Sequence, residues 1–99
     1  MPSKLNRLMR ELNKRESNAR IRQTVLFTRF KDTLDFLVNE LRTRRPSARI
    51  GTFSGGGGSR FDPASGKMIN LSRNEIAQDF VAGEIDVLLC TDAAAEGLN

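Results

Sequence analysis

The stretch Asp86 to Asn99, DVLLCTDAAAEGLN, contains the pattern that decides the fold of this chain. Residues 86–90 have the length of a buried strand, and the four residues after Asp86 are all apolar. A polar corner follows at Thr91 and Asp92, and residues 93–96 begin a helix. A strand that turns directly into a helix leaves backbone N–H groups and small hydroxyls at the sheet edge, where phosphate can bind. An ordinary strand-to-helix corner of an α/β domain explains the same pattern without a ligand.

The length and the charge of the chain limit its class. Its 99 residues are enough for one domain or part of one. The net charge of +4 is unevenly distributed: residues 1–50 hold 13 Lys and Arg against 5 Asp and Glu, whereas residues 51–99 hold 3 against 7. A basic amino-terminal half suits nucleic acid as a partner, and a solvated helix face explains it equally well.

Several kinds of chemistry are excluded by composition. Cys90 is the single cysteine and the chain has no histidine, so a disulfide framework, a CxxC zinc site and Ser–His or Cys–His catalysis cannot be built from it. No apolar run approaches the roughly 18 residues of a membrane span, and nothing resembles a signal peptide. We therefore expect no membrane contact and a cytoplasmic location.

The leading segment, residues 1–20, is predicted to be a basic amphipathic helix. Leu5, Leu8 and Leu12 repeat at helical spacing on one face. The opposite face is basic and holds Arg7, Arg10, Lys14 and Arg15. Such a face is either solvated or docks a polyanion, and the pattern alone leaves both readings open.

Three strands and two further helices follow. Residues 24–28 and 48–53 have the composition of strands, and residues 86–90 form the third. Asp32 or Thr33 is expected to cap the helix between the first two strands. Its predicted core positions are Leu34, Leu37, Val38 and Leu41.

The last complete helix carries clear terminal signals. Ser72 and Glu75 have the spacing of a capping box, and Gly83 suits the left-handed position after the helix. The predicted buried stripe consists of Ile76, Ala77, Phe80 and Val81.

Residues 54–69 include four consecutive glycines and are predicted to form a flexible loop. A phosphate cradle is the alternative. The Walker A pattern fails because Met68 follows Gly66 and Lys67, and the dinucleotide fingerprint fails because Arg60 occupies the position of its last glycine.

The order of elements predicts an α/β fold with a three-layer parallel sheet and right-handed crossovers. Ligands of such sheets bind beyond the carboxyl ends of the strands. Those ends lie at Thr28, Ser54 and Thr91, and each offers a hydroxyl. We therefore expect these three residues to meet at one edge that faces phosphate.

The same residues resemble a known family. In residues 72–99, Arg73 stands seven positions before Phe80, and the final strand leads into a TDxAxxGxD/N pattern called motif V. This arrangement resembles the second RecA-like domain of superfamily 2 helicases and translocases. The segments 25–30 and 33–41 are similar to motif IV and its helix in the Swi/Snf-like branch. The resemblance implies a partial RecA-like, P-loop NTPase-type lobe.

Roles for individual residues are implied by the resemblance. Thr91 and Arg73 match residues that contact the phosphate backbone of the nucleic acid. Thr28 and Gly55 lie where the family's nucleic-acid path passes. Gly97 and Asn99 match the end of motif V, which faces ATP across the cleft between two lobes.

The implied function is that of the second lobe of an ATP-dependent DNA helicase or translocase, acting with an N-terminal RecA-like lobe. ATP and Mg²⁺ are then bound mainly by that first lobe, whose Walker motifs these residues do not contain. The isolated chain is expected to lack ATPase activity. A non-enzymatic α/β module that binds nucleic acid or a partner protein through its basic helix is the alternative.

Overall fold

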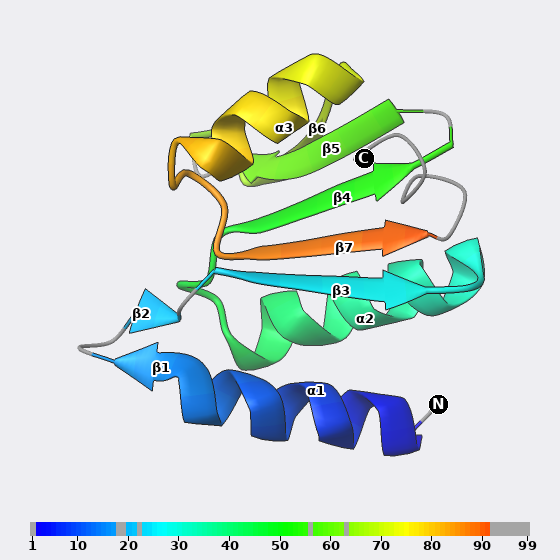
Figure 1. Cartoon of the computed structure of the whole chain (residues 1–99), viewed down its shortest axis with the longest axis vertical. Coiled ribbons are helices and arrows are strands. Elements are labelled where there is room, and N and C mark those ends of the chain that lie inside the picture. Colours follow the sequence, from blue (N-terminus) through cyan, green and yellow to red (C-terminus); the bar gives the residue numbers. More distant parts are fainter. Residues whose placement is uncertain (1, 18–19, 22, 56, 63, 92–99) are drawn as a thin grey trace.

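The computed structural model describes residues 2–17, 20–21, 23–55, 57–62 and 64–91. Its centre is a mixed sheet of five strands (Figure 1). In spatial order the strands are β3 (Thr24–Thr28), β7 (Val87–Thr91), β4 (Ile50–Ser54), β5 (Gly57–Asp62) and β6 (Lys67–Leu71). The first three strands are parallel, whereas β5 and β6 are antiparallel. The predicted parallel sheet is therefore confirmed for β3, β7 and β4, and the antiparallel strands β5 and β6, which the sequence did not predict, make the whole sheet mixed.

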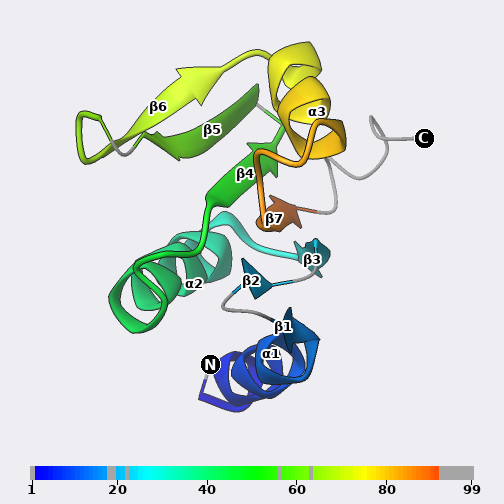
Figure 2. The ribbon, with the colours of Figure 1, turned by 90° about the vertical axis from the view of Figure 1, so that its left-hand side faces the viewer.

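Helices cover both faces of the sheet, so the predicted three layers are confirmed (Figure 2). α1 (Pro2–Arg15) and α2 (Lys31–Arg44) share one core with the sheet, and α3 (Arg73–Val81) packs on the opposite face. The predicted leucines of α1 and the four predicted core residues of α2 are all buried. None of the described helices is long and apolar enough to cross a membrane.

Strand β7, the middle one of the three parallel strands, contributes residues to both cores. Val87 and Leu89 pack toward α1 and α2, while Leu88 and Cys90 pack toward α3. All five residues of β7 are buried. This double burial explains why the strand reads as a continuous apolar run in the sequence.

The buried Cys90 gives a first testable prediction. Burial raises the pKa of its thiol to about 11, so the native thiol stays protonated at pH 8–9. We expect an aromatic disulfide reagent to label native Cys90 at least 100-fold more slowly than the urea-unfolded chain, because only the exposed thiolate reacts. Above pH 9 the unfolded state loses this proton first, so stability should fall as pH rises from 9 toward 11. Equal labelling rates for the native and unfolded chains would contradict the buried position.

The glycine-rich segment is not a loop, which corrects the prediction for residues 54–69. β4, β5 and β6 form a continuous antiparallel meander through this segment. The turn after β5 is closed by the backbone N–H of Gly66, which donates to the Asp62 carbonyl at 2.8 Å. Glycine has low strand propensity, but here the neighbouring strands supply the backbone hydrogen bonds.

One of these glycines is required by packing. A Cβ on Gly58 would lie 3.0 Å from the Thr52 carbonyl oxygen and 3.1 Å from the Ile76 side chain. Its absence lets α3 approach the sheet closely. Close packing, rather than flexibility, explains this glycine.

The amino-terminal helix is shorter than predicted. α1 ends at Arg15, and Glu16–Ser17 (β1) pairs antiparallel with Arg20–Ile21 (β2). The leucine spacing that supports the helix also ends at Leu12. The predicted continuation to residue 20 is therefore wrong.

The predicted cap of α3 is confirmed, whereas the predicted cap of α2 is wrong. The capping box of Ser72 and Glu75 is confirmed, with both hydrogen bonds at 3.1 Å. These bonds lower the pKa of Glu75 below its usual value. Neither Asp32 nor Thr33 caps α2, because Phe30 occupies that position without a side-chain bond. Val81 is 85% exposed, so its predicted place in the α3 core is wrong.

At the end of the sheet where the three parallel strands begin, one buried carboxylate connects the strands. Asp86 is 5% exposed and accepts hydrogen bonds from the Arg49 backbone N–H at 2.9 Å and from its guanidinium at 3.1 and 3.3 Å. The Asp86 carbonyl also accepts from the Thr24 N–H at 2.8 Å. This residue thus connects the starts of β3, β7 and β4.

Candidate nucleic-acid interface

The ends of the three parallel strands meet at one edge of the sheet. Thr28 pairs with Thr91 across β3 and β7. Phe53 pairs with Cys90, which places Ser54 level with Thr91 on the other side of β7. Neighbouring strands lie about 4.8 Å apart. The predicted meeting of the three ends is confirmed, and their contact with phosphate stays a prediction.

The three side chains also share a face. Side chains alternate along a strand, and Leu26, Ile50 and Leu89 belong to the core beneath α1 and α2. Thr28, Ser54 and Thr91 follow at even spacing and so lie on this same side. Thr28 is 2% and Thr91 is 7% exposed, so both side chains are buried at this edge, whereas Ser54 is half-buried.

The start of α2 adjoins these hydroxyls. β3 continues through Arg29 and Phe30 directly into the first turn of α2, whose amides receive no side-chain cap. Uncapped amides at a helix N-terminus favour an anion. Arg29 and Lys31 are both exposed beside this turn, and Lys31 forms an ion pair with Asp35 at 3.0 Å. Sequence reasoning missed Lys31, although it lies three residues after Thr28.

Arg73 reaches the same edge from the opposite face. It is the first residue of α3, and its guanidinium carbon lies 5.3 Å from the centroid of the Phe53 ring. Phe53 precedes Ser54 at the end of β4 and is 1% exposed. A cation over an aromatic face is held electrostatically. The exposed Arg73 is therefore held at the end of β4, and its contact with phosphate stays a prediction.

The remaining predicted residues are less well placed or not described. Gly55 is exposed at this edge, but it lies in the tight turn between β4 and β5, where Ser54 pairs with Gly57. Gly97 and Asn99 lie outside the described residues, so their contact with ATP stays a prediction. Within the described ranges, no group of three or more His, Cys, Asp or Glu side chains could hold a metal ion.

A comparison with known protein families identifies the family of this chain. The profile described as the helicase conserved C-terminal domain matches residues 3–99. Comparisons with curated proteins and with solved structures found no significant match. The family match spans the whole five-stranded sheet, nearly all of the helical residues and the edge formed by the three strand ends. The chain therefore belongs to the helicase conserved C-terminal domain family.

Proposed function

We propose that this chain is the second RecA-like lobe of an ATP-dependent DNA helicase or translocase of the Swi/Snf-like branch. Its edge formed by Thr28, Ser54 and Thr91 contacts the phosphate backbone of one strand. The convergence of these three hydroxyls on one face, in register, is the observation that carries the proposal. Arg73 adds a cation from the other face.

The electrostatics of the edge support a polyanion as the ligand. Arg29, Lys31 and Arg73 are exposed around the strand ends. Of these, Lys31 is partly neutralised by Asp35. Phosphate oxygens accept hydrogen bonds from hydroxyls, backbone N–H groups and guanidinium groups alike. The edge supplies hydroxyls and guanidinium groups, and the first turn of α2 supplies amides.

In this proposal ATP is bound mainly by the N-terminal RecA-like lobe, which is the partner of this chain. The described residues contain no metal-ligand cluster, so we assign Mg²⁺ and most ATP contacts to the N-terminal RecA-like lobe. Gly97 and Asn99 of this chain would face that nucleotide. The contribution of this lobe is to hold nucleic acid while the cleft opens and closes.

The experiment that tests the proposal is DNA-stimulated ATP hydrolysis by the protein that carries both lobes. Thr91→Ala should reduce the stimulation about tenfold and leave the unstimulated rate unchanged, because one hydroxyl that positions the DNA is lost. Thr91→Ser retains the hydroxyl and should keep most of the stimulation. Equal stimulation in wild type and Thr91→Ala would reject the role of Thr91.

One observation favours the second candidate, a binding module that uses α1. Its leucines are buried against the core, which leaves Arg7, Arg10 and Lys14 exposed on the outer side. If this face binds nucleic acid, the double variant Arg10→Gln and Lys14→Gln should weaken salt-dependent binding while Thr91→Ala does not. The opposite result favours the edge formed by the strand ends.

A further inference from the structure

A groove starts at the edge formed by the strand ends and follows α2. One wall is α2, from Lys31 to Arg42, and the other wall is formed by β4, β5 and β6. The groove has a volume of about 560 Å³. An adjoining pocket of about 420 Å³ shares Asn39 and Arg42 with it, so the two are neighbours along α2. Both volumes fall in the usual range for ligand sites, about 300–1,000 Å³.

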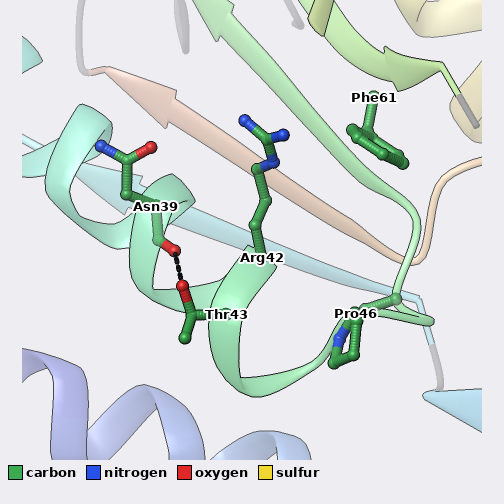
Figure 3. Close-up of a pocket in the computed structure, with 6 residues that line it drawn as sticks. Asn39, Arg42, Thr43, Pro46 and Phe61 are labelled. Atoms are coloured by element: carbon green, nitrogen blue, oxygen red, sulfur yellow. Dashed lines mark hydrogen bonds between the residues drawn. The ribbon is translucent and has the colours of Figure 1, made fainter. Parts of the chain in front are cut away.

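The far end of the groove pairs a cation with an aromatic ring. The Arg42 guanidinium carbon lies 5.0 Å from the centroid of the Phe61 ring, and Nη2 donates to the Gly66 carbonyl at 3.4 Å. Figure 3 shows Arg42 between Asn39 and Phe61, with Pro46 below them. These contacts hold the guanidinium over one face of the ring.

The orientation of Phe61 follows from the alternation along β5. Gly58 faces Ile76 of α3, and Arg60 donates to Asp79 of α3 at 3.0 Å. Ser59 and Phe61 therefore point the other way, toward α2. Ser59 meets the Thr52 hydroxyl there. The hairpin thus presents an aromatic ring on a wall that is otherwise rich in small and polar side chains.

We propose that this groove binds a single strand of nucleic acid, with one base stacked on Phe61 and a phosphate contacted by Arg42. The inference rests on the proposed function, because the groove opens at the edge that holds the phosphate backbone. Aromatic side chains beside cations are the usual platform for unpaired bases. The path from Lys31 to Arg42 is about 16 Å long at 1.5 Å per helical residue. That length fits about five stacked nucleotides at 3.4 Å each.

The charges along the groove indicate that Arg42, rather than Lys31, contacts the phosphate. Lys31 and Asp35 form an ion pair at 3.0 Å, so the entrance carries little net charge. Arg42 bonds to a carbonyl and a ring instead of a carboxylate in the contacts above, so its charge is not neutralised there. Asn39 and Asn70 add amide groups that can bond to base edges. A duplex keeps its bases stacked internally and cannot use Phe61 in this way.

The test uses the 99-residue chain and a fluorescein-labelled oligothymidylate that carries one 2-aminopurine. Phe61→Leu should weaken binding five- to tenfold and abolish the stacking-dependent change in 2-aminopurine fluorescence, because leucine keeps the apolar volume but not the ring. Arg42→Gln should weaken binding about fivefold and reduce its salt dependence. Arg44→Gln is the matched control, since Arg44 pairs with Glu40 at 3.3 Å and lies outside the groove lining. Thermal unfolding followed by circular dichroism checks that the variants are folded.

The outcomes separate this inference from the proposed function. If Arg73→Gln weakens binding while Phe61→Leu and Arg42→Gln do not, the groove inference is overturned and the proposed function stands. If the groove variants alone weaken binding, the groove binds a strand and the assignment of the edge fails. Weakening by Arg42→Gln with an unchanged fluorescence signal in Phe61→Leu would show that the strand binds through charge without a base stacked on Phe61, and would also overturn the proposal.

Discussion

Arg73→Gln is expected to lower the affinity of this chain for DNA about tenfold at low salt. It should also reduce the slope of log affinity against log salt by about one, the change expected when one phosphate contact is lost. The guanidinium is exposed at the end of β4 and held over Phe53, so its removal deletes a charge without opening the core. Fluorescence anisotropy across a salt series measures both quantities.

Arg73→Lys is the matched control for this prediction. It retains the positive charge, so the salt slope should stay close to that of the wild type, while the weaker geometry of an ammonium group costs a smaller loss of affinity. If Arg73→Gln leaves both the affinity and the slope unchanged, Arg73 does not contact phosphate.

Asp86→Ala is expected to lower the free energy of unfolding by about 3 kcal/mol. The buried carboxylate accepts three hydrogen bonds from Arg49, and its loss leaves a backbone N–H and a partly buried guanidinium without that partner. The value is at the low end for a broken buried pair because the Arg49 side chain is 35% exposed. Urea unfolding at pH 7 measures the change.

Glu84→Gln tests whether that loss is specific to the buried carboxylate. Glu84 also faces Arg49, but at 3.7 Å and with its side chain 62% exposed. Exposed pairs of this kind contribute about 0–1 kcal/mol. Equal destabilisation by the two substitutions would contradict the structural role given to Asp86.

The parallel core of the fold could be predicted from the sequence because burial leaves a strong pattern. β3 coincides with the predicted residues 24–28, and the apolar run before Thr91 becomes the middle one of the three parallel strands. The capping box at Ser72 could also be predicted from the sequence, since its two hydrogen bonds depend only on the local spacing of Ser72 and Glu75.

The β5–β6 hairpin could not be predicted in the same way. Its strand residues include Gly57 and Gly58, whose low strand propensity is offset by pairing with β4 and β6. That pairing, like the close packing of Gly58 on Ile76, depends on residues distant in the sequence. The turn residues Asp62 and Gly66 were a usable signal, because Asp and Gly at such spacing favour a tight turn.

The candidate site was predictable in part. Thr28, Ser54 and Thr91 meet as expected, because the ends of parallel strands share an edge. The uncapped start of α2 was not foreseen, since the sequence offers Asp32 and Thr33 as caps and Phe30 takes that position instead. The groove beside α2 was also missed, because it exists only where the hairpin folds toward the helix.

The most direct test of the account is an amide NMR titration of this chain with a short single-stranded DNA. We predict that the largest chemical-shift changes occur at Thr28, Ser54, Thr91 and Arg73, and that they saturate together. Changes confined to the basic face of α1, with these four amides unmoved, would contradict the assignment of the strand ends as the nucleic-acid interface.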